Sequence, residues 1–139
     1  MVNKFISVAV IALTGTKRVE VTQDEIIIDD GLVLPTQQEI EKKVKELEAE
    51  YQIKQQKEAF NNAIQTHLDT KAKEFRYDNI MSVRSYAGYE NPFQAEAQKL
   101  AVWASNCWVK AGEIEAEVQA GNRDMPTIDE VLAELPVYE

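Results

Sequence analysis

Cysteine, glycine and basic residues are scarce in this sequence, and each scarcity argues against a class of function. The single cysteine among 139 residues excludes an intramolecular disulfide framework and a zinc site built from cysteines. The five glycines are scattered, and no glycine-rich phosphate-binding motif occurs. Lysine and arginine total 15 against 24 acidic residues, which gives a net charge of −9. We therefore expect no binding to nucleic-acid phosphates or to anionic membrane surfaces.

What is present fits one folding unit, or a small core with an appendage, divided into three segments by charge. Apolar residues make up 45% and charged residues 28%, which are ordinary values for a globular protein. Residues 1–35 carry a net charge of −2, residues 36–76 carry 0, and residues 77–139 carry −7. We expect an α+β, mainly α, chain with a small N-terminal antiparallel β meander, a long helical stalk and a compact C-terminal helical bundle in these three segments.

The first segment begins with an uncharged apolar run, residues 5–13, which follows Lys4. This pattern resembles the start of a signal peptide, but about nine residues are far too few for a membrane span. No clear cleavage site follows, so we expect the run to remain part of the chain. Its β-branched residues and the turn at 14–16 predict a buried strand. Residues 17–22 and 25–29 predict two further strands, which complete a three-stranded meander.

Residues 36–76 have the composition of one long helix. Thr36 and Glu39 have the spacing of a capping box, and neither glycine nor proline follows before residue 77. The apolar positions form a narrow seam that changes phase near residues 55–57, as in an imperfect coiled coil. The seam consists first of Ile40, Val44, Leu47 and Tyr51, and then of Ile53, Phe60, Ile64 and Leu68.

The length of this helix is the main reason to expect partner chains. About 40 helical residues make a rod of roughly 60 Å, whereas a compact chain of this size has a diameter of roughly 37 Å. Either the helix breaks near the change of phase or other chains hold it, and we favour the second. We therefore expect an oligomer or a part of a larger assembly. The candidate partner-binding residues of the first strand and the seam are Phe5, Val8, Val10, Ile40, Val44, Leu47 and Tyr51.

The last segment, residues 77–139, predicts a compact bundle. Asp78 can cap a short helix over residues 79–86. Asn91-Pro92 and Gly121 mark the ends of a longer helix that carries an unbroken heptad seam with small residues at its centre. Thr127 starts a second capping box and a short terminal helix.

Trp103 and Trp108 flank the seam of the longer helix. They are candidate partner-binding residues because aromatic side chains dominate interface hot spots. Burial within the bundle is an equally good interpretation of the pattern.

No set of residues predicts catalysis or ligand binding. His67 stands alone and suits a solvated or seam-edge position. Cys107 lies on the apolar seam, where a buried thiol behaves as a small hydrophobe. Glu113 and Glu117 share a helix face that is most simply solvated. We expect neither a cofactor nor a metal, and no enzymatic activity.

About 60 residues of the C-terminal part resemble a known module. The resemblance rests on these stretches: Tyr77-Asp78-Asn79-Ile80, Ser85-Tyr86-Ala87, Asn91-Pro92-Phe93-Gln94-Ala95-Glu96, Trp103 and Trp108, Val118-Gln119-Ala120-Gly121, Pro126-Thr127 and Glu130-Val131-Leu132-Ala133-Glu134-Leu135-Pro136. They are similar to the C-terminal module of small proteins of tailed phages and prophages, typically encoded beside tail-fibre and baseplate genes. Members often carry charged residues just after the first tryptophan, where this chain has Ala104-Ser105. No catalytic residue carries over from the module.

The resemblance implies a structural protein of a bacteriophage tail, in the fibre, the fibre attachment or the baseplate periphery. Such a protein would lie in the virion, and in the host cytoplasm during assembly. Its partners would be other phage tail proteins, copies of itself, or both. The alternative is a tail fibre assembly chaperone that leaves before the particle is complete, and an enzyme is a distant third. We expect residues 1–76 to carry attachment, and the acidic bundle to make secondary, salt-dependent contacts.

Overall fold

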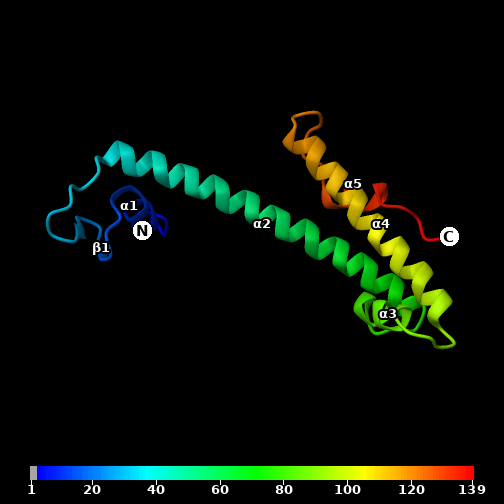
Figure 1. Ribbon diagram of the computed structural model, residues 1–139. Coiled ribbons are helices and arrows are strands. Elements are labelled where there is room, and N and C mark those ends of the chain that lie inside the picture. Colours follow the sequence, from blue (N-terminus) through cyan, green and yellow to red (C-terminus); the bar gives the residue numbers. More distant parts are fainter. Residues whose placement is uncertain (1–2) are drawn as a thin grey trace. The chain divides into compact units, whose positions relative to one another are not determined.

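The computed structural model describes residues 3–139 and is mainly helical (Figure 1). In chain order, the elements of this described part are α1 (Ile6–Thr14), β1 (Val19–Val21), β2 (Ile26–Ile28), α2 (Gln37–Glu74), α3 (Ile80–Ala87), α4 (Gln94–Gln119) and α5 (Ile128–Glu134). This confirms the predicted fold class: a small N-terminal antiparallel sheet, a long helix and a helical C-terminal part.

The chain divides into two compact units, Met1–Lys57 and Glu58–Glu139, and α2 contributes to both. The division differs from the predicted segments 1–35, 36–76 and 77–139 because the two parts of the apolar seam serve different cores. Ile40 and Val44 belong to the core of the first unit, whereas Ile64 and Leu68 belong to the core of the second. The seam changes phase near the boundary for this reason, and the helix does not end there.

The predicted first strand is a helix, α1, which corrects the three-stranded meander to a two-stranded sheet. Phe5, Ile6, Ala9 and Val10 recur at helical spacing, and all four lie in the core of the first unit. As a helix, this apolar segment satisfies most of its backbone hydrogen bonds internally, whereas a third strand would need the edge of the sheet. Gly15 ends α1 with a φ of 69°.

β1 and β2 form an antiparallel pair in which Val19 lies opposite Ile28. The carboxylate of Asp29 holds the chain before β1: it accepts hydrogen bonds from the hydroxyl of Thr16 at 2.9 Å and from the backbone N–H of Lys17 at 2.7 Å. The bond from Lys17 N–H, followed by that from Thr16, lowers the pKa of Asp29 below its ordinary value.

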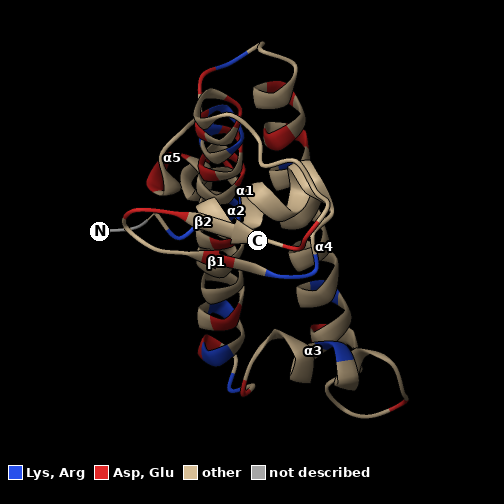
Figure 2. Cartoon of the chain, turned by 90° about the vertical axis from the view of Figure 1, so that its left-hand side faces the viewer, with Lys and Arg blue, Asp and Glu red and all other residues tan. Residues whose placement is uncertain are grey.

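The predicted capping box at the start of α2 is confirmed. Thr36 Oγ1 accepts a hydrogen bond from the Glu39 N–H at 3.2 Å, and the Glu39 carboxylate accepts one from the Thr36 N–H at 2.8 Å. Acidic and basic residues are interleaved along the helix (Figure 2). Every residue from 49 to 59 is exposed, so neither unit covers this stretch.

The second unit packs α3, α4 and α5 against the C-terminal part of α2. Asn79, next to the predicted Asp78, caps α3 by accepting a hydrogen bond from the Ser82 N–H at 2.9 Å. Thr127 and Glu130 form the predicted capping box of α5. The largest fully buried side chains of this unit are Leu68, Ile80, Val83, Leu100 and Cys107.

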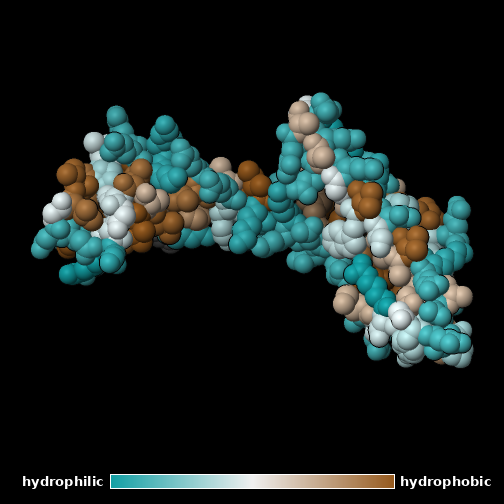
Figure 3. All heavy atoms as spheres, in the orientation of Figure 1, coloured by the Kyte–Doolittle hydropathy of each residue, from teal (hydrophilic) through white to brown (hydrophobic). Residues whose placement is uncertain are grey.

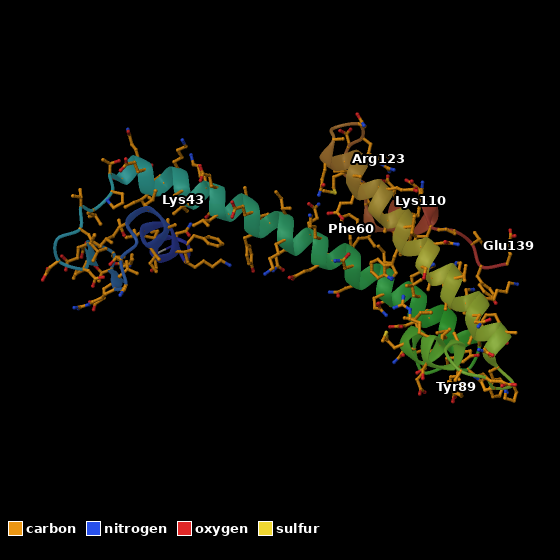
Figure 4. All side chains as sticks on the ribbon, in the orientation of Figure 1. Lys43, Phe60, Tyr89, Lys110, Arg123 and Glu139 are labelled. Atoms are coloured by element: carbon orange, nitrogen blue, oxygen red, sulfur yellow. The ribbon has the colours of Figure 1, made fainter. Side chains whose placement is uncertain are left out.

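A charged contact joins the end of α4 to α5. The guanidinium of Arg123 donates to both oxygens of Glu134, at 2.7 and 3.1 Å, and lies 3.5 Å from Glu117 (Figure 4). Bidentate geometry of this kind orients α5 more than it stabilises the unit, because exposed ion pairs contribute little.

Candidate protein-interaction surfaces

Most of the predicted partner-binding residues of the first unit contact one another within the chain. Val10, Ile40 and Val44 are buried, and Phe5 and Leu47 pack against them. These five side chains therefore form a core, in which α1 covers the first part of the α2 seam.

Val8 remains available, on the outer face of α1. It is 48% exposed, Ile11 is 44% exposed, and Ala12 is also exposed. The three residues recur at i, i+3 and i+4, so they share one side of the helix, opposite Ala9 and Val10. A helix that is apolar all round is normally covered on all sides. The outer face of α1 is therefore a candidate protein-interaction surface, and hydrophobic residues are visible over this unit in Figure 3.

Tyr51 lies at the edge of the same unit. Its ring contacts that of Phe5, with centroids 5.6 Å apart, and the ammonium of Lys4 lies 4.1 Å from its centroid. One face of this predicted residue is thus occupied by a cation of the chain itself.

The two tryptophans lie in the second unit. Trp103 is only 6% exposed, and its indole Nε1–H donates to the carbonyl of Pro136 at 2.8 Å. Trp108 is half-buried and packs against the core. The C-terminal residues complete this packing, since the ring of Tyr138 contacts those of Trp103 and Phe75. The burial of Trp103 agrees with the second of the two sequence interpretations.

A different aromatic group is exposed at the turn between α3 and α4, where Figure 4 labels Tyr89. Tyr86, Tyr89 and Phe93 are 38%, 51% and 56% exposed, and we call them the aromatic surface. The ring centroid of Tyr86 lies 5.9 Å from that of Tyr89 and 6.1 Å from that of Phe93. The ring of Tyr86 thus contacts both of the others, and a group of large rings open to solvent has the composition of an interface hot spot.

The Asn-Pro-Phe-Gln-Ala-Glu motif builds this surface. Asn91 Nδ2 donates to the carbonyls of Tyr86 and Tyr89, both at 2.7 Å, and its Oδ1 accepts from the Phe93 N–H at 2.9 Å. One asparagine side chain therefore fixes the backbone at all three rings. Gln94 adds a longer bond, 3.4 Å, to the carbonyl of Ala87.

Glu96, the last residue of the motif, is linked to the aromatic surface through Tyr77. Its carboxylate accepts a hydrogen bond of 3.0 Å from the hydroxyl of Tyr77, whose ring lies 5.7 Å from that of Tyr86. Burial, together with this hydrogen bond to a carboxylate, raises the pKa of Tyr77 to about 12. Tyr77 is thus a neutral donor that ties the aromatic surface to α4.

Sequence reasoning missed this surface although a signal was present. Three of the five tyrosines and one of the four phenylalanines fall between residues 77 and 93. The heptad seam instead favoured the tryptophans as candidates. Periodicity identifies the buried face of a helix but gives no information about the turn before it.

The remaining candidates are His67, Cys107 and the exposed pair Glu113 and Glu117. The ring of His67 lies 5.8 Å from that of Trp103 and borders an open pocket of about 410 Å³. Burial raises the pKa of Cys107 to about 11, which keeps it a thiol at neutral pH. Within residues 3–139, no three His, Cys, Asp or Glu side chains are grouped as metal ligands would be. No helix of this described part is both long and apolar enough to cross a membrane.

Comparison of the chain with protein families, with curated proteins and with solved structures found no match.

Proposed function

We propose that this chain is a structural protein of a bacteriophage tail, in the fibre, the fibre attachment or the baseplate periphery, and that it acts by binding other proteins. The observation that carries the proposal is the role of the Asn-Pro-Phe-Gln-Ala-Glu motif, the most specific part of the resemblance. Asn91, Phe93 and Glu96 of that motif hold or form an exposed aromatic surface. A motif used in this way suits recognition of a protein and involves no catalytic group.

The two units would make different kinds of contact with partner proteins. The outer face of α1 supplies an apolar contact of the kind that stable attachment uses, because Val8 and Ile11 gain by leaving water. The second unit, with residues 77–139 carrying −7, supplies the contacts that depend on salt. Because of this difference, the first unit would attach the chain, and the second unit would make secondary contacts. The partners are other tail proteins, copies of the chain, or both.

Mass spectrometry of purified particles tests the proposal. A structural protein is present in the particle at a stoichiometric level, as a species of 15.8 kDa. Absence from particles, combined with recovery bound to a fibre protein in lysate, would identify an assembly chaperone instead. Absence from both would refute each of these functions.

A further inference from the structure

In the described part of the chain, the rings of the aromatic surface of Tyr86, Tyr89 and Phe93 carry no cation of the chain, whereas Tyr51 and Tyr138 each carry a lysine ammonium over the ring. Tyr51 carries the ammonium of Lys4 at 4.1 Å from its ring centroid, and Tyr138 carries that of Lys99 at 5.2 Å. Within residues 3–139, no lysine or arginine of the chain lies over the rings of the aromatic surface.

Arg84, the basic residue nearest in sequence, does not lie over these rings. Arg84 lies on α3, two residues before Tyr86, and the contact of its guanidinium is with the sulfur of Met81 at 3.9 Å. The ring faces that solvent reaches are therefore open to a cation from another molecule.

The charges around the surface favour such a cation. Glu90 is exposed in the same turn, directly after Tyr89, and the exposed Glu96 accepts a hydrogen bond from the hydroxyl of Tyr77, whose ring contacts that of Tyr86. Asp78, next to Tyr77, is exposed as well. Residues 77–96 contain three acidic residues and one basic residue, Arg84. Aromatic faces beside carboxylates suit a guanidinium, which can stack on a ring and donate paired hydrogen bonds to a carboxylate at the same time.

We propose that the aromatic surface binds an arginine-bearing segment of a partner protein, with a guanidinium stacked on an exposed ring of that surface and paired with Glu90. The proposal deepens the proposed function, on which the identity of the partner as a tail protein rests. The recognition chemistry itself does not depend on that identity. Arginine is preferred over lysine because a planar guanidinium stacks on a ring, whereas an ammonium is a more strongly hydrated point charge.

Peptide binding to the full chain, followed by the NMR shifts of its backbone amides, tests the proposal without any phage particle. The probes are an acetylated Gly-Arg repeat peptide and the matched Gly-Lys peptide. We expect saturable shifts centred on residues 86–93, with the arginine peptide binding more tightly. Tyr89→Ala should weaken binding of the arginine peptide about two- to fivefold, as should Phe93→Ala. Tyr89→Phe, which keeps the ring, should bind like the wild type.

Two controls separate recognition from simple charge attraction and from unfolding. Val102→Ala removes a side chain that is equally exposed on α4, and it should leave binding unchanged. Each variant's own amide spectrum shows whether it is folded. The proposal is overturned if the shifts spread over the acidic face of Glu113 and Glu117 and persist in Tyr89→Ala. Equal affinity for the two peptides would also overturn it. Either result would leave the mass-spectrometric test of the proposed function unaffected.

Discussion

Replacement of Asn91 by alanine tests the account of the turn between α3 and α4. The change removes two donated hydrogen bonds of 2.7 Å and one accepted bond of 2.9 Å. The accepted bond resembles a helix N-cap, whose loss costs about 1 kcal/mol. The two carbonyls can turn to water because the site is exposed, so each adds no more than about 0.5 kcal/mol. We expect the free energy of unfolding of the second unit to fall by about 1–2 kcal/mol.

Urea unfolding followed by tryptophan fluorescence measures this loss, because Trp103 and Trp108 both lie in the second unit. For a unit of this size, each kcal/mol also lowers Tm by about 4–8 °C. The matched control is Asn106→Ala, at an exposed position of α4, where alanine should leave stability unchanged or raise it by about 0.5 kcal/mol. If Asn91→Ala unfolds at the wild-type urea concentration, the side chain does not hold the turn, and this explanation of the motif is refuted.

Three further predictions concern the two cores. Ala104 is fully buried, so Ala104→Leu should overpack the second unit and lower its stability by about 1–3 kcal/mol; an unchanged Tm would place this seam in solvent. The raised pKa of Tyr77 means that its neutral form stabilises the fold fully below pH 10, and that this contribution disappears between pH 10 and about 12. Tyr77→Phe should flatten the dependence of stability on pH in that range, as measured by tryptophan fluorescence. The lowered pKa of Asp29 means that its carboxylate stabilises the first unit above pH 3.8, and that this contribution is lost as the pH falls through the folded-state value. The protection of the β1 amides, measured as their exchange rate relative to the intrinsic rate at each pH, should therefore fall on acidification in the wild type but show no such transition in Asp29→Asn.

Local signals in the sequence predicted the starts of α2 and α5, whereas α4 begins at Gln94, with Phe93 at its cap position, and not at Asn91-Pro92 as expected. The capping boxes at Thr36 and Thr127 depend on residues three positions apart, so no information about tertiary structure was needed to place them. The absence of glycine and proline likewise predicted that α2 would be continuous.

Features that depend on tertiary contacts were harder to predict. The segment that forms α1 is rich in β-branched residues, and that weak preference is outweighed by packing of Phe5, Ala9 and Val10 at helical spacing. The seam of α2 suggested partner chains, whereas its two ends, around Val44 and Leu68, are covered within the chain and only its middle, with Tyr51 and Ile53, is exposed. Coverage by partner chains remains a prediction for residues 49–59, which are exposed throughout.

The aromatic surface also depends on information that periodicity does not contain. The side chain of Asn91 holds the rings of this surface together by donating hydrogen bonds to the backbone carbonyls of Tyr86 and Tyr89. These hydrogen bonds form only when the turn closes. A sequence motif identified these residues through resemblance, but their shared physical role emerged only from the structure.

We propose that the chain is a structural part of the particle and that its first unit holds it there. Deleting residues 1–13 would remove Ala9 and Val10 from the core, so the sharper change is Val8→Ser with Ile11→Ser on the outer face of α1. The measurement is the amount of full-length chain per purified particle, by quantitative mass spectrometry, with Val102→Ser as the control for lost exposed apolar surface. We expect stoichiometric incorporation of the wild type and the control, and a loss of at least about tenfold for the α1 variant. Undiminished incorporation of the folded α1 variant would place attachment elsewhere, and absence of the wild type from particles would contradict the claim as a whole.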